Sequence, residues 1–316
     1  MAVSASIART DRPGPASPAP RRVLVTGAAG LLGSEVVRQL RARGIAVTAF
    51  LHRPGTVEAE RVVAGSMDDV VLVRDAMDGV DAVVHCAALR NPMMGTPEAV
   101  FIGNTAGTFT VLEQAGQAGI RRAVIASSYS VFGLVFSRAL LRPAYLPIDD
   151  VLPLQVADPY AHSKQVDELT ADLMATRHGM TVVSLRLPFL GGLDDTIAER
   201  AARVADDPDH STAAREFWTY LDTRDAARAC ILGLTEPPRG SHRITLAAPT
   251  TLAPYHTEAL LDRYYPGVPR RAPFPGRTAP FDLSNARRLL RFEAEHIVAV
   301  EERDGLPEPA GVGSDG

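Results

Sequence analysis

The chain has 316 residues, of which 46% are hydrophobic and 22% charged, a composition typical of a folded globular protein with a sizeable core. Its 33 lysines and arginines against 37 aspartates and glutamates give a net charge of −4, which argues against nucleic-acid binding because phosphate recognition needs a basic face. No stretch approaches the roughly 18 consecutive apolar residues of a membrane span. Among the 33 basic residues only Lys164 is a lysine, which leaves 32 arginines.

Both ends of the chain are predicted to be unstructured. Residues 1–20 contain several prolines and lack the continuous apolar centre of a signal peptide, so they are expected to form a disordered tail. Residues 304–316 are expected to form a flexible tail. Cys86 and Cys230 lie in apolar stretches far apart in the sequence, which favours buried, reduced thiols of a cytoplasmic protein over the alternative of a disulfide.

Over residues 21–190, short runs rich in valine and isoleucine alternate with segments of helical periodicity. Strands are predicted in RRVLVTG, GIAVTAFL, RVVAG, DAVVHCAA, RRAVIASS and TVVSLRL, and helices in SEVVRQLRARG, MDDVVLVRDAMDG and TFTVLEQAGQAG. Strands without alternation of apolar and polar residues are buried on both faces, and helices between them supply the crossovers. The pattern therefore predicts an α/β fold, a Rossmann-type doubly wound parallel sheet.

After about residue 190 this alternation weakens. An acidic helix over 194–206, a strand over 217–222, a helix over 223–234, a strand over 242–248 and two further helices over 256–264 and 284–292 are predicted. We expect residues 191–303 to form a smaller, partly discontinuous lobe that binds substrate, with parts of 218–249 packing on the sheet domain.

The first predicted strand runs into the loop TGAAGLLG, which a predicted helix follows. Gly27 permits a tight turn, Gly30 lets the backbone approach a pyrophosphate, and Gly33 allows close packing of helix and strand. Leu31 and Leu32 of the loop are also expected to contact the cofactor, and the N-terminus of the helix that follows favours an anion. A purely structural turn is the alternative, but the order of strand, loop and helix favours dinucleotide binding by this domain.

The end of the second predicted strand bears on which dinucleotide binds. An acidic residue there would bind the ribose hydroxyl of NAD, whereas basic residues accommodate the 2′-phosphate of NADP. The sequence has no acid at this point and offers His52 and Arg53. A solvated surface arginine is the alternative, and NAD remains open, but the missing acid favours NADP.

Tyr160 and Lys164 form the most specific candidate pair for chemistry. Asp158 and Pro159 mark the start of a helix, so the two side chains project from one face, one turn apart. A phenol is a poor acid or base at neutral pH, but a neighbouring ammonium stabilises the phenolate and acts to lower its pKa. The alternative is a coincidental surface pair.

A strand that ends in SSYSVFG supplies a third candidate. The carboxyl ends of parallel strands face the ligand crevice, so the hydroxyl of Ser128 can point at a substrate. The alternative is that this serine only satisfies backbone groups in a turn. The long apolar segment between Ser128 and Tyr160 is expected to line a substrate pocket and exclude water.

These motifs together resemble the extended short-chain dehydrogenase/reductases, also called the NAD-dependent epimerase/dehydratase family. The resemblance covers residues 21–292 and rests, in the family's order, on TGAAGLLG, VHCAA, NTAGT, SSYSVFG, the Tyr160 and Lys164 pair, LRLPFLGG and TYLDTRDAARA. It implies that Ser128 polarises the substrate oxygen, that Tyr160 exchanges the proton, and that Lys164 binds the nicotinamide ribose and holds down the pKa of the tyrosine.

The resemblance also implies further contacts with the cofactor, and a homodimer formed through a pair of helices. The implied cofactor-binding residues beyond the glycine loop are Ser66 and Met67 beside the adenine, Ala87, Ala88 and Leu89 along the cofactor, Asn104 orienting a helix or a water, and Pro188 after the sixth strand.

Three departures from the family pattern bear on the substrate. Family members that dehydrate sugar nucleotides carry an Asp-Glu pair where this chain has Tyr129 and Ser130. Epimerases of sugar nucleotides usually place an asparagine after the arginine of the sixth strand, whereas Arg186 is followed by Leu187. The tyrosine that is common before the glycine of SSYSVFG is Phe132. These differences favour a small substrate that is not a nucleotide sugar.

The sequence thus predicts an NAD(P)-dependent oxidoreductase that moves a hydride between nicotinamide and a carbonyl or secondary alcohol. Two alternatives stay open: an epimerase of sugars or nucleotide sugars that retains its cofactor, and a non-catalytic scaffold that senses NAD(P). The expected partner is a small-molecule substrate, with no nucleic acid and no membrane. The eight histidines show no spacing typical of metal ligands, so no metal is expected.

Overall fold

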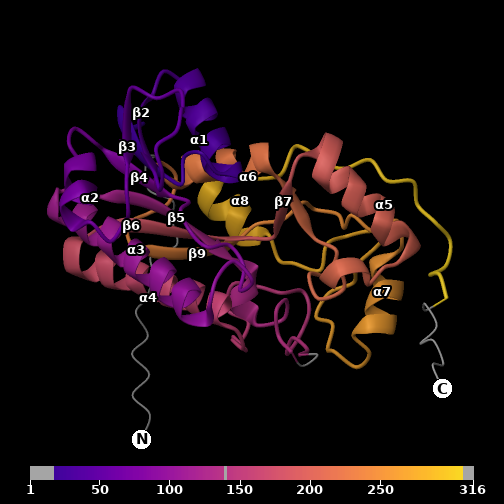
Figure 1. Cartoon of the computed structure of the whole chain (residues 1–316). Helices are drawn as coiled ribbons and strands as arrows, with labels where there is room; N and C mark the ends of the chain where they lie inside the picture. Colours follow the sequence, from indigo (N-terminus) through magenta and orange to yellow (C-terminus); the bar gives the residue numbers. More distant parts are fainter. Residues whose placement is uncertain (1–17, 139–140, 309–316) are drawn as a thin grey trace, which may run out of the picture.

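A seven-stranded parallel sheet forms the centre of the computed structural model, which describes residues 18–138 and 141–308 (Figure 1). The strand order is β3-β2-β1-β4-β5-β6-β9, the order of a doubly wound sheet with one added strand. This confirms the predicted fold class. The expectations for residues 1–17 and 309–316 lie outside the described parts. The strands are β1 (Arg22–Thr26), β2 (Ala46–Leu51), β3 (Arg61–Ala64), β4 (Ala82–His85), β5 (Arg122–Ser128), β6 (Thr181–Leu187) and β9 (Ser241–Thr245).

Helices cover both faces of this sheet (Figure 1). One face packs against α1 (Leu31–Ala42), α6 (Thr223–Gly233) and α8 (Ser284–Leu290). The other packs against α2 (Val70–Ala76), α3 (Pro97–Gln117) and α4 (Pro159–His178). Central strands are buried on both faces, which is why they read as continuous apolar runs. Within the described residues, none of these helices is long and apolar enough to cross a bilayer.

The sequence determines where α4 begins and ends. Asp158 is its N-cap, and one carboxylate oxygen accepts a hydrogen bond from the Ala161 N–H at 2.9 Å. Pro159 occupies the first turn, where its missing N–H costs nothing. The helix ends at Gly179, whose φ of 63° is left-handed. This fixed start places Tyr160 in the first turn of the helix.

A smaller lobe follows the sixth strand and has its own apolar core. It contains the two-stranded parallel sheet of β7 (Phe189–Gly191) and β8 (Tyr220–Asp222), a π-helical turn (Leu193–Ile197), α5 (Ala198–Asp206) and α7 (Thr257–Tyr264). Short 3₁₀ turns lie at Tyr129–Phe132 and His210–Thr212. In Figure 1 this lobe lies beside the sheet domain, with α5 and α7 farthest from the sheet.

Several elements of the lobe are shorter than predicted. The strand expected over 217–222 begins only at Tyr220, because Phe217 and Trp218 have left-handed φ angles of 54° and 53° that no strand accommodates. The acidic helix expected from residue 194 is regular only from Ala198, after the π-helical turn. β9, expected over 242–248, leaves the lobe and pairs with β6 in the central sheet.

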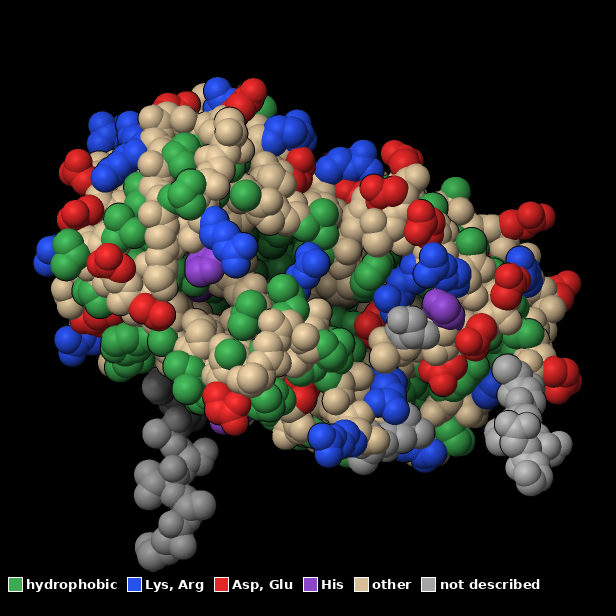
Figure 2. All heavy atoms as spheres, viewed as in Figure 1, with side chains coloured by type: hydrophobic (Ala, Val, Ile, Leu, Met, Phe, Trp, Pro, Cys, Tyr) green, Lys and Arg blue, Asp and Glu red, His purple; other side chains and the backbone are tan. Residues whose placement is uncertain are grey.

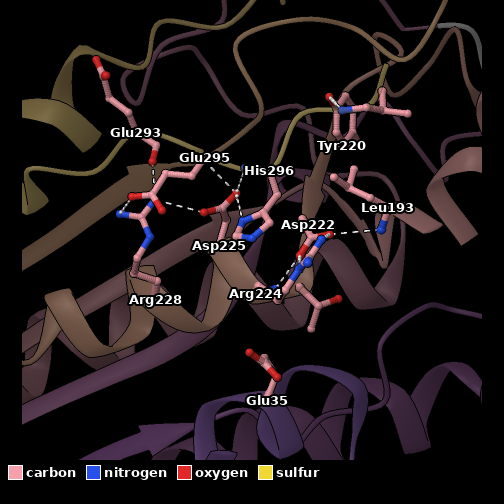
Figure 3. A network of polar contacts seen from close by, with 12 residues as sticks. Glu35, Leu193, Tyr220, Asp222, Arg224, Asp225, Arg228, Glu293, Glu295 and His296 are labelled. Carbon is pink, nitrogen blue, oxygen red and sulfur yellow. Dashed lines mark hydrogen bonds and ion pairs between the residues drawn. The ribbon is translucent and has the colours of Figure 1, made fainter. Parts of the chain in front are cut away.

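The segment after α8 runs back across α6 and over the lobe (Figures 1 and 3). The buried carboxylate of Asp225, on α6, accepts hydrogen bonds from the backbone N–H groups of Glu295 at 3.0 Å and His296 at 2.8 Å. Farther along, the Val298 N–H donates to the Tyr220 hydroxyl at 2.9 Å. Val298 belongs to the lobe core, so this segment ties the lobe to the sheet domain.

Candidate active site

The predicted site residues gather where strands of the central sheet end. Because the strands are parallel, the carboxyl ends of β1, β4, β5 and β6 meet at one edge, where ligands bind in doubly wound sheets. Figure 2 shows the molecule hollowed between the sheet domain and the smaller lobe, with hydrophobic side chains on both sides. This edge therefore has the place and surroundings of a ligand crevice.

The glycine loop has the geometry that a pyrophosphate needs. Gly27 has a left-handed φ of 65°, and a Cβ atom there would lie 2.8 Å from the Ala87 nitrogen. A Cβ on Gly33 would lie 2.2 Å from the Gly27 carbonyl oxygen, so helix and loop pack too closely for any side chain. Gly30 is the N-cap of α1 and provides no side chain to cap it. The residues present thus fit a dinucleotide, whose phosphates would take the place of a cap.

His52 and Arg53 follow directly on β2 and are exposed. A cavity of about 670 Å³ beside the glycine loop is lined by Ala28 and Ala29, by Arg38 and Arg41 of α1, and by Glu58 and Glu60, among others. No acidic residue stands at the end of β2. The first acid after it is Glu58, whose carboxylate pairs with Arg41 at 2.5 Å. The adenosine end of the crevice therefore offers basic groups next to the loop.

Asn104, on α3, fixes the loop that follows β4. Its side-chain oxygen accepts from the Leu89 N–H at 2.8 Å, and its amide nitrogen donates to the Leu89 carbonyl at 3.0 Å. The same amide donates to the Ser163 hydroxyl of α4 at 3.0 Å. Asn104 thus connects the loop of Ala87, Ala88 and Leu89 to the helix that carries Tyr160, so it orients protein groups.

Three other predicted cofactor contacts follow β3 and β6, two strands that lie far apart in the sheet. Ser66 and Met67 follow β3, and a Cβ on Gly107 of α3 would lie 2.9 Å from the Met67 methyl carbon. The glycine of the NTAGT motif therefore makes room for this methionine. Pro188 is buried between β6 and β7.

The structure brings Ser128, Tyr160 and Lys164 together. Ser128 ends β5, and its hydroxyl donates to that of Ser130 at 3.0 Å and lies close enough to Tyr160 to act on the pKa of the phenol. The Lys164 ammonium lies 6.0 Å from the centre of the Tyr160 ring. All three side chains are buried, and the Phe136 ring meets Tyr160 edge-on with centroids 6.0 Å apart. A phenol, a hydroxyl and an ammonium thus meet in an apolar setting, a combination suited to acid–base chemistry on an oxygen.

The electrostatics of this group differ in one respect from the sequence-based expectation. Burial raises the pKa of Tyr160 above its ordinary value, although Lys164 and the hydrogen bond with Ser128 act to lower it. The effect of the lysine has the predicted sign, but desolvation of the phenolate outweighs it. Burial also acts to lower the pKa of Lys164, yet the net pKa is raised, chiefly by Asp167 and then by Tyr160.

Two neighbouring residues complete the site. His85, at the end of β4, lies with Nδ1 2.7 Å from the Thr26 hydroxyl and Nε2 3.1 Å from that of Thr108. Burial and then the charge of Lys164 lower the pKa of His85 to about 3, so its ring is neutral. Sequence reasoning missed Asp167, whose carboxylate lies 3.1 Å from the Lys164 ammonium. The only signal was its position three residues after the lysine on one helix face.

The two cysteines, far apart in the sequence, come close together in space. Cys86 follows β4 and lies close enough to Cys230 on α6 that, together with burial, it raises the pKa of the Cys230 thiol well above its ordinary value. Both are free thiols. Within the described residues, no group of three or more histidine, cysteine, aspartate and glutamate side chains could hold a metal ion.

A doubly wound sheet, a glycine loop and a Ser-Tyr-Lys group at the ends of its strands define a dinucleotide-binding protein of the short-chain dehydrogenase type. Residues 23–247 match the NAD-dependent epimerase/dehydratase family. The chain belongs to this family, the extended short-chain dehydrogenase/reductases, which confirms the resemblance found in the motifs.

Two relatives with different names illustrate the range of proteins that this chain resembles. The chain is 34% identical over 188 residues to "Sterol demethylase protein B" of Methylococcus capsulatus, an alignment that covers 57% of this chain and 51% of that protein. It is 36% identical over 187 residues to "L-arabinose 1-dehydrogenase (NAD(P)(+))" of Haloferax volcanii, covering 55% of this chain and 69% of that protein. The chain thus spans only about half the length of the sterol demethylase protein.

A solved structure shares the overall architecture. It is a short-chain dehydrogenase/reductase superfamily protein from Agrobacterium tumefaciens with bound NAD. The two chains superpose with a TM-score of 0.65 at 26% sequence identity, over 87% of this chain and 93% of that one.

Proposed function

We propose that the chain is an NAD(P)-dependent oxidoreductase that moves a hydride between nicotinamide and a carbonyl or secondary alcohol of a small, non-nucleotide substrate. The observation that carries this proposal is the meeting of Ser128, Tyr160 and Lys164 at the edge of the sheet where the glycine loop lies. Membership of the family and the dehydrogenase among its relatives support it.

In the proposed reaction, Tyr160, Ser128 and Lys164 each have a separate role. The bound cofactor supplies the hydride to the carbonyl carbon, or takes it back in the reverse reaction. In reduction Tyr160 gives its phenolic proton to the carbonyl oxygen, and Ser128 donates a hydrogen bond to that oxygen as negative charge develops. Lys164 stabilises the phenolate left behind and holds the ribose of the cofactor. Hydride and proton together convert the carbonyl into an alcohol.

We propose NADP as the preferred cofactor. His52 and Arg53 stand where an acid would bind the ribose of NAD, and both are exposed toward solvent. Arg53→Ala should raise the Kd of NADPH about tenfold and leave that of NADH unchanged, measured by cofactor fluorescence. The matched control is Arg74→Ala on α2. Equal Kd values for both cofactors in the wild type would refute the preference.

The surroundings of Tyr160 favour an apolar substrate over a nucleotide sugar. Phe136 covers the phenol, and Leu187 follows Arg186 where epimerases of sugar nucleotides usually carry an asparagine. Tyr129 stands at the position of the first dehydratase acid, and burial, followed by the charge of Glu216, raises its pKa well above the ordinary value. It therefore stays protonated and cannot replace a carboxylate. The relative whose name refers to sterols is consistent with such a pocket.

The test of the reaction uses Tyr160→Phe. This variant should lower kcat for NADPH-dependent carbonyl reduction by about 10²–10⁴-fold and change the Kd of NADPH little, because the phenol transfers the proton but does not hold the cofactor. Tyr264→Phe, a tyrosine of the lobe far along the chain, is the control. Full turnover by Tyr160→Phe would overturn the mechanism.

The same residues could serve an epimerase, which oxidises and reduces one substrate in turn and retains its cofactor. Stoichiometric consumption of NADPH with a free aldehyde or ketone supports the oxidoreductase. Isomerisation of a sugar without net cofactor consumption supports the epimerase. Binding of cofactor without turnover across a panel of aldehydes, ketones and sugars supports the scaffold.

We further propose a homodimer through α3 and α4. Each helix carries exposed apolar side chains: Ile102 and Phe109, which are 59% and 44% exposed, and Leu169 and Leu173, which are 55% and 46% exposed. The two helices pack side by side, with Phe101 and His162 stacked at 4.9 Å between ring centroids. A second copy of the chain would bury both apolar stripes.

A further inference from the structure

The buried ion pair between Lys164 and Asp167 lies inside the candidate site. The ammonium nitrogen is 3.1 Å from one carboxylate oxygen, and the two side chains are only 4% and 2% exposed. Both come from α4, three residues apart, so they lie on one face of the helix. The only lysine of the chain therefore enters the site already paired with an acid.

Neutral polar groups on three other elements, α3, β4 and β1, surround this pair. The hydroxyl of Thr108, on α3, acts to lower the pKa of the Asp167 carboxyl and lies 3.1 Å from His85 Nε2. His85 Nδ1 in turn lies 2.7 Å from the Thr26 hydroxyl at the end of β1. The carboxylate is thus connected through buried side chains to the strand that enters the glycine loop.

Other ionisable groups lie around this pair, but Asp167 is the acid that balances the positive charge of Lys164. His85, on β4, is neutral, and Cys86, directly after this strand, is a free thiol. On α4, Asp158 caps the helix at its start, and Tyr160 is protonated because burial raises its pKa. Tyr129, after β5, is protonated because burial raises its pKa in the same way.

Glu168, the next residue on α4, is already neutralised. Its carboxylate pairs with Arg186 of β6 at 2.8 Å and with Arg243 of β9 at 3.1 Å. It also accepts a hydrogen bond from the Ser127 hydroxyl at 2.7 Å. Glu168 therefore faces arginines, while Asp167 faces the lysine.

We propose that Asp167 is a positioning residue that keeps the Lys164 ammonium charged and fixed beside Tyr160. A buried ammonium without a counter-charge gives up its proton readily, and a lysine that has lost its charge can no longer stabilise a phenolate. The catalytic part of this inference rests on the proposed function. The contact itself does not.

The single lysine makes the protonation state directly measurable. Selective ¹⁵N labelling of lysine in the full chain gives one side-chain ammonium signal by NMR, and that signal belongs to Lys164. In the wild type the signal should persist above pH 10.5, the ordinary pKa of lysine, because Asp167 raises the pKa of Lys164. A wild-type midpoint at or below 10.5 would overturn the proposal without any variant.

Asp167→Asn removes the charge and keeps the shape of the side chain. The ammonium midpoint should fall by at least about 1 pH unit, and so should the alkaline limb of kcat/KM for NADPH-dependent reduction. The alkaline limb shifts to lower pH because Tyr160 and Lys164 titrate as a coupled pair. This pair loses its first proton more easily once the negative charge of Asp167 is gone. Asp167→Glu should restore both values.

Asp172→Asn is the matched control, since this acid also lies on α4 but pairs with Arg243. Unchanged midpoint and limb in Asp167→Asn, or equal shifts in Asp172→Asn, would refute the positioning role. A chain that shows the ammonium shift but reduces no carbonyl compound would support the contact and overturn the proposed function, so the two failures are distinguishable.

Discussion

At the scale of single residues, position 164 differs from every other basic position because it carries a lysine and not an arginine. Arginine supplies the other 32 basic residues, many of them in exposed ion pairs such as Arg38 with Glu35. Lys164 instead lies buried between Asp167 and the Tyr160 ring. A compact ammonium fits this space, whereas a planar guanidinium needs a broad set of acceptors that a site of this size does not offer.

Lys164→Arg is therefore expected to fail although it preserves the charge. We expect kcat/KM for carbonyl reduction to fall by about 10²-fold or more, because the larger group displaces the phenol or the ribose. Steady-state kinetics with NADPH provide the measurement, and Arg177→Lys, an exposed exchange in the opposite sense on the same helix, is the control. Turnover at the wild-type rate would mean that the solitary lysine reflects composition alone.

At the scale of elements, α3 and α4 are joined at their C-terminal ends by Glu113. Its carboxylate lies 3.2 Å from Arg177 and 2.9 Å from His178 Nε2, and it accepts a hydrogen bond from Gln117 at 2.9 Å. The hydrogen bond with His178, followed by that with Gln117, lowers the pKa of Glu113 from 4.5 to about 2. The ionised carboxylate thus favours the packed helices.

Glu113→Gln should show a stability difference that depends on pH. Because the folded pKa lies below 4.5, the ionised group stabilises the fold above that pH, and its contribution is lost as the pH falls from 4.5 toward 2. Allowing for solvent screening, we expect the variant to lose about 1 kcal/mol of unfolding free energy at pH 7. Denaturant titrations at pH 7 and pH 3 measure it, because less than half of the contribution remains at pH 3. An equal loss at both pH values would contradict the assignment, and Glu199→Gln on exposed α5 is the control.

Helices with strong local signals could be predicted from the sequence, whereas irregular segments could not. The start of α4 follows from Asp158 and Pro159, which cap and open a helix wherever they are placed. The prediction of a strand over 217–222 was wrong in its first half. Phe217 and Trp218 are residue types common in strands, but packing within the lobe holds their backbone in the left-handed region. The local sequence therefore does not predict the left-handed backbone of these two residues.

The candidate site divides in the same way. The glycine loop and the spacing of Tyr160 and Lys164 are local, so the sequence indicates them directly. The elevated pKa of Tyr160 depends on how deeply the assembled fold buries the phenol. The pairing of Lys164 with Asp167 rather than with Glu168 depends on which acid meets the arginines of β6 and β9. Both properties arise only when distant strands assemble.

At the scale of the whole molecule, the two parts are joined by the segment after α8. Asp225 holds it through two backbone N–H groups, and Arg228 braces the same carboxylate at 3.0 Å (Figure 3). Asp225→Asn should cost about 1–3 kcal/mol of unfolding free energy, since an amide leaves one of these buried groups without its acceptor. Denaturant unfolding measures the loss, with exposed Asp262→Asn as control. A variant as stable as the wild type would show that the apolar contacts of the segment suffice.

The proposed dimer is tested by placing a charge on its apolar stripe. We expect the wild type to sediment at twice the 33.8 kDa chain mass, and Leu169→Arg to sediment mainly as a monomer at the same micromolar concentration, because burying an unpaired guanidinium costs more than the lost apolar contact. Val151→Arg, which changes a residue that is 80% exposed outside α3 and α4, is the control. Analytical ultracentrifugation distinguishes the species.

A wild-type monomer, or a dimer that Leu169→Arg leaves intact, would mean that α3 and α4 do not form the contact. Since α4 also carries Tyr160 and Lys164, a dimer through this face would brace the helix that holds the catalytic pair, and the monomeric variant should then lose turnover along with its partner.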